Sequence, residues 1–315
     1  MSDQHAGGDA LLEGLLAALQ ATFGRHPGQR ATHAKGIVAS GSFTATAAAA
    51  RLSRAAHLQG QAVPVTLRFS NFSGVPQTPD GDPMASPRGL GIRFHLEGGA
   101  QTDIVAHSFD GFPVGTPQQF LEFLQAIAAS VSDSAPDAAP LERFLAAHDS
   151  ARHYLETPKP APRSYASLSY FGVNAFLLTA ADGALTMGRY RIDPTLAHAF
   201  VPDEELPVLA DGYLADELAA LLAQGPVSMR LKFQLAGTGD DGADGSATWP
   251  HSGPDARTEI DLGELRIMAL ADDQVQAARD LALDPGRLID GLMLSDDPMV
   301  PVRSAVYRLA ASRRR

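Results

Sequence analysis

Near the start of the chain, a histidine follows a cation at a spacing that suits acid–base chemistry. Arg30 lies three residues before His33, at the entrance to a strand expected from Gly36 onward. A histidine in this setting can act as a general base near an anionic group. A lone histidine is more often an ordinary surface or core residue, so the pattern alone leaves both interpretations open.

A second group lies on a strand expected over residues 63–74, where apolar and polar residues alternate. Alternation directs Arg68 and Ser70 to one face of the strand and Phe69 to the other. If the face of Arg68 lines the interior of a barrel, its guanidinium needs an anion beside it, because an unpaired buried charge is costly. If that face meets solvent, no anion is required.

The third group is an arginine and a tyrosine near the carboxyl end. Arg303 and Tyr307 are four residues apart on an expected helix, so the guanidinium can lie against the phenol oxygen. A neighbouring positive charge favours phenolate over phenol. A phenolate is a good ligand for ferric iron, and the chain has no cysteine that could serve instead. A surface pair without a function has the same spacing.

The composition limits what these residues can do. Of the 315 residues, 45% are hydrophobic and 19% are charged, which is enough apolar material for a sizeable core. The formal net charge of -11 disfavours nucleic-acid binding, because an acidic surface repels phosphate backbones. The absence of cysteine excludes disulfides and thiolate-bound metals, so any metal must be held by histidine, tyrosine, methionine or carboxylates.

The elements around these groups indicate the architecture that must position them. Strands expected at 63–74, 90–99 and 227–237 alternate with helices at 116–130 and around 213–224. Antiparallel strands interrupted by helices are typical of the α+β class. A large closed antiparallel β-barrel with accessory helices is the natural form of such a chain.

The first residues predict a helix rather than a targeting signal. Leucines recur on one helical face between residues 11 and 19, and acidic residues interrupt the apolar stretch. We therefore expect an amphipathic helix over residues 1–24, followed by a barrel domain over residues 25–315 that ends in the helix of Tyr307. No window of about 18 uncharged apolar residues is present, so we expect a cytoplasmic protein with no membrane span.

Several of these residues occur in the order found in the haem catalases, which the sequence resembles from about residue 25 to 315. The matching segments are Arg-x-x-His-Ala-Lys-Gly at 30–36, Arg-Phe-Ser at 68–70, Pro-Arg-Gly at 87–89, Tyr-Phe-Gly-Val-Asn-Ala-Phe at 170–176 and Arg-x-x-x-Tyr at 303–307. The resemblance is closest to the short catalase-related peroxidases. It implies the catalase haem fold without the C-terminal helical domain of the large enzymes.

The resemblance implies a role for each matching residue toward haem b (iron protoporphyrin IX). His33 resembles the distal histidine and Ser70 the serine that is hydrogen-bonded to it. Tyr307 resembles the proximal iron ligand, with Arg303 as its charge partner. The remaining matches are to residues that hold the haem: Arg30, Arg68 and Arg314 to arginines that bind the propionates, and Phe120 to a phenylalanine that packs on the haem face.

Two positions depart from the catalase pattern. In an ungapped reading, Ser108 falls where catalases carry a distal asparagine, and a shift of register would bring His107 or Asp110 there instead. A serine is shorter than asparagine and has no amide N–H for the peroxide. Thr32 stands where catalases usually have valine, and coral allene oxide synthases share this Thr-His pair.

The resemblance implies a haem-dependent peroxidase that uses hydrogen peroxide or organic hydroperoxides to oxidise small organic donors, with at most weak catalase activity. One alternative is a haem isomerase or dehydratase of fatty-acid hydroperoxides, which Thr32 and His33 suggest. Another is a barrel that binds haem without catalysis. The missing arms of the large catalases lead us to expect a monomer or small homo-oligomer.

Overall fold

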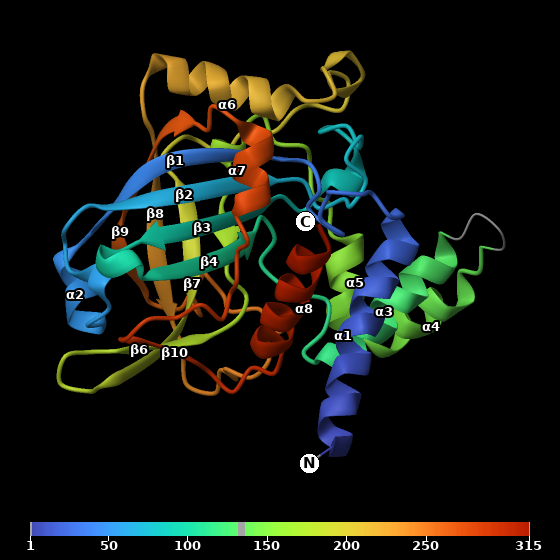
Figure 1. Ribbon diagram of the computed structural model, residues 1–315, viewed down its shortest axis with the longest axis horizontal. Coiled ribbons are helices and arrows are strands. Elements are labelled where there is room, and N and C mark those ends of the chain that lie inside the picture. Colours follow the sequence, from blue (N-terminus) through green and yellow to red (C-terminus); the bar gives the residue numbers. More distant parts are fainter. Residues whose placement is uncertain (1, 132–135, 315) are drawn as a thin grey trace.

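The computed structural model describes residues 2–131 and 136–314 of the chain. Eight antiparallel strands close into a barrel, because β8 pairs with β7 as well as with β9 (Figure 1). In order around the barrel these strands are β7 (Leu185–Pro194), β5 (Tyr170–Phe171), β4 (Gln101–His107), β3 (Gly89–His95), β2 (Val63–Ser70), β1 (Gly36–Ala45), β9 (Glu259–Leu270) and β8 (Val227–Leu235). Two short strands, β6 (Phe176–Thr179) and β10 (Leu292–Leu294), extend the sheet from β7. The expected closed antiparallel barrel with helices is confirmed.

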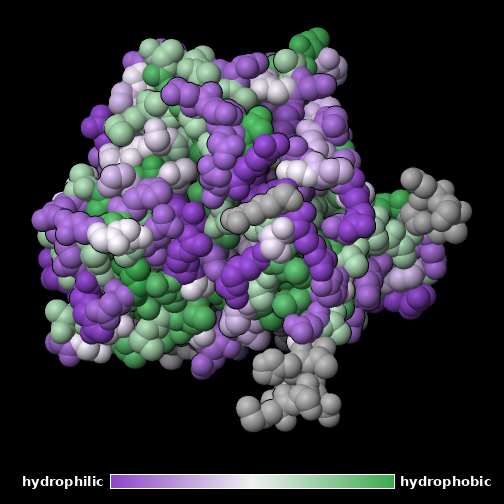
Figure 2. Space-filling model, in the orientation of Figure 1, coloured by the Kyte–Doolittle hydropathy of each residue, from purple (hydrophilic) through white to green (hydrophobic). Residues whose placement is uncertain are grey.

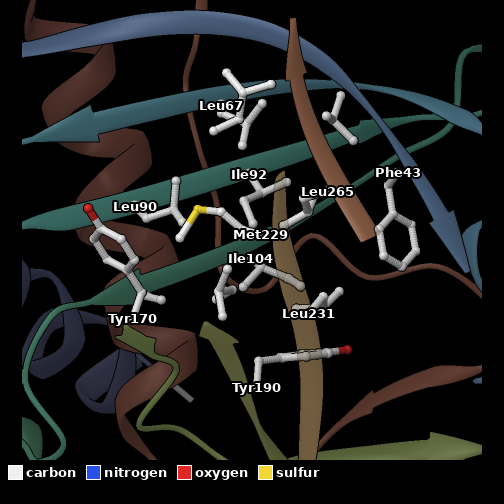
Figure 3. Close-up of a cluster of buried hydrophobic side chains, with 14 of the residues drawn as sticks. Phe43, Leu67, Leu90, Ile92, Ile104, Tyr170, Tyr190, Met229, Leu231 and Leu265 are labelled. Carbon is white, nitrogen blue, oxygen red and sulfur yellow. The ribbon is translucent and has the colours of Figure 1, made fainter. Parts of the chain in front are cut away.

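Apolar side chains fill the inside of the barrel. Leu67, Leu90, Ile92 and Leu231 are at most 1% exposed, and Figure 3 shows them converging from β2, β3 and β8. They come from alternate positions of their strands, because successive side chains of a strand point to opposite faces. These side chains form the main apolar core of the molecule.

The alternate positions of β2, β3 and β4 point outward. Arg68 and Ser70 lie on this outer face, while Leu67 and Phe69 belong to the interior core. The barrel-interior location considered for Arg68 from the sequence is therefore wrong. Arg68 and Ser70 are nevertheless each only 4% exposed. Helices that cover this face keep both residues away from solvent.

Helices α1 (Ser2–Phe23) and α8 (Met299–Arg314) lie side by side against this part of the barrel, and α3 (Pro117–Ser130) packs on α1 (Figure 1). Leu15, Leu19 and Phe23 of α1 form a common apolar cluster with Leu124 of α3 and Val306 of α8. Because α1 has its leucines on one face, that face can hold three helices together. Hydrophilic side chains surround the C-terminal end of α8 (Figure 2).

Helices α2 (Ala47–Leu52), α6 (Tyr213–Gln224) and α7 (Gln274–Asp280) pack on strands of the barrel. Helices α4 (Ala139–Ala147) and α5 (Asp149–Glu156) instead share an apolar cluster with α3, beside the barrel (Figure 1). Helix α3 begins as its sequence predicts, since Pro117 is its first residue and the Thr116 hydroxyl accepts a hydrogen bond from the backbone N–H of Gln119 at 3.3 Å. None of the helices in residues 2–131 and 136–314 combines the length and apolar character needed to cross a membrane.

Candidate active site

A cavity lies between the outer face of β2, β3 and β4 and the helices α1 and α8. Eight of the ten residues singled out from the sequence line it. They are Arg30, Thr32, His33, Arg68, Ser70, Arg303, Tyr307 and Arg314. The cavity thus brings together residues from the two ends of the chain, which the fold places on facing walls.

His33 is held by its backbone and by its ring. Its φ of 55° lies in the left-handed region, which a non-glycine residue adopts at a cost of about 1–3 kcal/mol, mostly at functional sites. The backbone N–H of His33 donates to the carbonyl of Phe72 at 2.9 Å. The ring nitrogen Nδ1 lies 3.0 Å from Ser70 Oγ, and the Phe72 ring meets the imidazole edge-on. These contacts fix the imidazole against the barrel wall.

Gly89 of β3 makes the space that the His33 ring occupies. A Cβ at this position would lie 2.8 Å from His33 Nδ1 and 2.7 Å from Ser70 Oγ. Gly89 pairs with Ser70 on one side and with His107 on the other. A side chain at residue 89 would therefore displace either the imidazole or the serine.

The histidine is neutral at physiological pH. Burial lowers the pKa of His33 to about 3, and the positive charge of Arg68 acts in the same direction. A neutral imidazole keeps one nitrogen free to accept a proton. Thr32 also lines the cavity, but its hydroxyl donates to the carbonyl of Phe72 at 2.6 Å. The hydrogen of Thr32 is therefore directed to the backbone and not to His33.

Three arginines place positive charge in the cavity wall. Burial lowers the pKa of Arg30 to about 8, with a further contribution from the like charges of Arg68 and Arg314. Burial also lowers the pKa of Arg68 to about 10. The guanidinium of Arg68 donates to the carbonyls of His33 and Ala34, but its Nε has no hydrogen-bond partner among the described residues. A buried guanidinium with an open N–H such as Arg68 Nε is stabilised by an anion placed beside it.

On the opposite wall, Arg303 and Tyr307 face the cavity from α8. The Arg303 Nη2 donates to the Tyr307 phenol oxygen at 3.3 Å. The other end of the same guanidinium donates to Asn174 Oδ1, and Asn174 Nδ2 donates to Asp297 at 2.7 Å. Asp297 is 2% exposed and its second oxygen accepts from the backbone N–H of Met299, the first residue of α8. The helix start therefore anchors the arginine that contacts the tyrosine.

Neither Asn174 nor Asp297 was identified from the sequence as a site residue. Asn174 lies inside the Tyr-Phe-Gly-Val-Asn-Ala-Phe segment, but nothing in the segment shows that its amide reaches α8. Asp297 stands two residues before the helix, a position typical of a residue that caps a helix. That signal indicates a structural role, and only the fold shows that the same carboxylate also holds Asn174.

Two predicted residues lie elsewhere. Ser108 is not among the described residues that line the cavity, and its hydroxyl accepts from the backbone N–H of Arg88 at 2.8 Å. His107 lines the cavity instead, because β4 presents residue 107 on the outer face. Phe120 lies in the cluster between helices, with its ring 5.1 Å from that of Phe112, and is also absent from the cavity lining in the described part of the chain.

Comparison with known proteins shows the family of the chain. A family model described as catalase matches residues 4–315. The chain is 34% identical over 295 residues to a catalase-related peroxidase of Mycolicibacterium paratuberculosis, which covers 93% of this chain and 91% of that protein. It is 30% identical over 303 residues to a catalase-related peroxidase of Synechococcus elongatus, covering 95% and 87%. The chain belongs to the catalase family.

Solved structures give the same fold. A fungal catalase superposes with a TM-score of 0.81 at 20% identity, and a bacterial catalase with a TM-score of 0.79 at 23% identity. Each comparison covers 92% of this chain, which spans 60% of the fungal and 58% of the bacterial structure. These two structures therefore support the barrel and its helices.

The catalase family implies haem, and the residues around the cavity fit such a group. The phenol oxygen of Tyr307 is a donor that suits ferric iron. The arginines that line the cavity are the cations that two propionates require, and the unpartnered Nε of Arg68 is available to such an anion. Leu16, Leu19 and Val306 supply apolar contact for a flat ring.

Proposed function

We propose that the chain is a haem-dependent peroxidase that uses hydrogen peroxide or organic hydroperoxides to oxidise small organic donors, with at most weak catalase activity. Membership of the catalase family makes it an oxidoreductase that acts on peroxide. The observation that carries the finer proposal is that the His33–Ser70 pair and the Arg303–Tyr307 pair face one cavity from opposite walls.

In this proposal haem b is held from both walls. Tyr307 would ligate the iron, and Arg30, Arg68 and Arg314 would bind the propionates. Arg303 donates a hydrogen bond to the phenol oxygen and would hold it in place to bind iron. When bound, the haem supplies the oxidation–reduction chemistry that the side chains themselves lack.

His33 performs the acid–base work on the peroxide. Its Nε2 would take the proton from one peroxide oxygen and return it to the other as the O–O bond breaks, so that the second oxygen leaves as water, or as an alcohol from an organic hydroperoxide. The two electrons that this cleavage consumes would come from the bound haem. For Nε2 to accept, Nδ1 must carry the ring hydrogen and donate it to Ser70 Oγ. Ser70 Oγ can accept that hydrogen, so the contact is compatible with the tautomer that this chemistry requires.

The peroxidase assignment, in preference to catalase, follows from the relatives and from the residue expected at the distal asparagine position. The two relatives at 34% and 30% identity are both catalase-related peroxidases. The Ser108 hydroxyl bonds to the Arg88 backbone, so neither an asparagine amide nor this serine serves the peroxide. We infer that the enzyme passes oxidising power to organic donors more readily than to a second peroxide.

The test compares haem content and turnover in Tyr307→Phe and His33→Gln with Tyr213→Phe and His198→Gln as matched controls outside the cavity lining. Tyr307→Phe should lose haem, and His33→Gln should keep haem but turn over peroxide at least about 100-fold more slowly with a dye donor. The controls should behave as wild type. Unchanged haem content and turnover in both site variants would overturn the proposal, and oxygen release faster than dye oxidation would reverse the peroxidase assignment.

A further inference from the structure

We propose that His107 is a second peroxide-binding residue, whose imidazole donates a hydrogen bond to the peroxide oxygen that does not face His33. This inference rests on the proposed peroxidase function and names a residue that completes its peroxide pocket. It begins from an unusual feature of the cavity wall. Neither ring nitrogen of His107 has a hydrogen-bond partner among the described residues, although both nitrogens are buried.

Buried polar atoms without partners are rare in folded proteins, because each forfeits the hydrogen bonds that water would give it. His107 lines the same cavity as His33, so its unpartnered imidazole belongs to the wall of that cavity. The ring is supported from other sides by Phe112 and Tyr154, whose ring centroids lie 6.3 and 6.5 Å from its own. Neither aromatic residue is hydrogen-bonded to His107, so the cavity is where a partner can lie.

Strand register places His107 beside the residues that handle the peroxide. Ser70 pairs with Gly89, and Gly89 pairs with His107, so the three stand in one row across β2, β3 and β4 on the outer face. Neighbouring strands lie about 4.8 Å apart, which separates Ser70 from His107 by roughly 10 Å. The His33 ring lies over the middle of this row, against Gly89. Two imidazoles therefore border the same part of the cavity.

The charge state of His107 suits a hydrogen-bond donor. Burial lowers its pKa to about 3, and the positive charges of Arg303 and Lys159 act in the same direction. At neutral pH the ring therefore carries one N–H donor and one acceptor nitrogen. His33 uses its acceptor nitrogen as the base, so a second ring with an N–H can steady the other oxygen without any proton transfer.

The experiment uses cyanide as a probe that binds haem iron without turnover, in the purified holoprotein and in His107→Leu, His107→Asn and the control His198→Leu. We expect His107→Leu to keep its haem but to bind cyanide about tenfold or more weakly, and to show a raised KM for hydrogen peroxide. His107→Asn retains an N–H donor and should restore most of both losses. The control should match wild type.

Cyanide affinity and peroxide KM within twofold of wild type in His107→Leu would overturn the inference. A low-spin haem spectrum in wild type that His107→Leu abolishes would also overturn it, because His107 would then be an iron ligand. If His107→Leu fails to fold or to bind haem, His107→Asn and His107→Gln are compared instead, because both side chains keep an N–H donor. An equal loss of cyanide affinity in both would count against a donor role. Absence of haem from the wild-type protein would instead remove the proposed function itself.

Discussion

At the scale of single residues, one hydroxyl and the burial of the ring set the orientation and the protonation state of His33. Its Nδ1 has Ser70 as partner at 3.0 Å, and its ring is desolvated enough to bring the pKa to about 3. The imidazole thus stays neutral over the whole physiological range, and its orientation rests on one hydroxyl. Second partners of this kind fix both the tautomer and the direction of a functional histidine.

Replacing Ser70 with alanine tests that dependence. Ser70→Ala leaves Nδ1 without its partner, so the hydrogen bond that orients the imidazole is lost. We expect peroxide turnover to fall about tenfold with unchanged haem content, a loss equivalent to one hydrogen bond. Steady-state kinetics at matched haem concentration give the measurement, with Ser312→Ala on the exposed end of α8 as control. Full activity in Ser70→Ala would show that His33 is oriented by its backbone alone.

The second residue-scale prediction concerns the chain of contacts behind Tyr307. Asn174→Ala removes the link between Arg303 and Asp297 and leaves a guanidinium and a carboxylate without their partner. The free energy of unfolding should fall by about 1–3 kcal/mol, and the haem absorption bands should shift because Arg303 is no longer held beside the phenol. Urea unfolding and a visible spectrum measure the two effects. Lower stability with an unshifted spectrum would limit Asn174 to a structural role.

At the scale of elements, the sequence predicts the strands and helices well but not which face of a strand is inside. The expected helix at 116–130 is α3, and the expected strands at 63–74 and 227–237 are β2 and β8, each slightly shorter. Alternation correctly separates Arg68 from Phe69. Alternation cannot show which face lies inside the barrel, because the outer face beside α1 and α8 is also shielded from solvent.

The same limit explains the misplacement of Ser108. Strand β4 ends at His107, and a shift of one residue moves every side chain to the other face. An ungapped comparison with the catalase pattern can therefore be wrong by one residue, as it is at Ser108. Distinctive neighbouring residues in the sequence therefore indicate His33, Ser70, Arg303 and Tyr307 as cavity residues. The segment at the end of β4 is less distinctive, so it does not indicate His107.

A prediction at the element scale concerns the close packing at β3. Gly89→Ala introduces a Cβ within 3 Å of both the His33 ring and the Ser70 hydroxyl. The imidazole must move, since the strand is paired on both sides, and we expect peroxide turnover to fall at least tenfold while the barrel remains folded. Gly212→Ala, where a Cβ meets nothing within 4 Å, is the control. Equal turnover in the two variants would contradict the proposed placement of His33.

At the scale of the whole molecule, the barrel works as one wall of the site and the helices from the two chain ends work as the other. Composition and strand pattern predict the barrel, because a barrel requires only a large apolar core and antiparallel strands. The location of the site outside the barrel could not be predicted. It follows from the pairing of α1 with α8 beside the outer face of β2, β3 and β4, and that pairing joins residues some 300 positions apart in sequence, such as Glu13 and Arg313 in their ion pair.

The buried histidines predict how the whole molecule responds to acid. His33, His57 and His107 each have a pKa lowered to about 3 by burial, against an unfolded value of about 6.5. Between these values the unfolded chain binds more protons than the native one, so the free energy of unfolding falls as pH falls from about 6.5 toward 3. Each such histidine contributes a slope of up to about 1.4 kcal/mol per pH unit.

His57 isolates this effect, because it lies among Phe43 and Phe94 in the barrel core and not in the cavity. His57→Leu removes one titrating group, so the fall in stability between pH 6.5 and pH 4 should be shallower than in wild type, whatever the change at pH 7. Urea unfolding at several pH values measures the slope. An unchanged slope would show that His57 is not neutral and buried in the native protein.

The central claim is that the phenol oxygen of Tyr307 ligates a haem iron, and the visible absorption spectrum of the purified ferric protein tests it most directly. We predict a high-spin haem bound by phenolate in wild type and in Tyr213→Phe, and a lost or altered spectrum in Tyr307→Phe. A haem spectrum that is identical in wild type and Tyr307→Phe would contradict the account, as would a wild-type protein that takes up no haem.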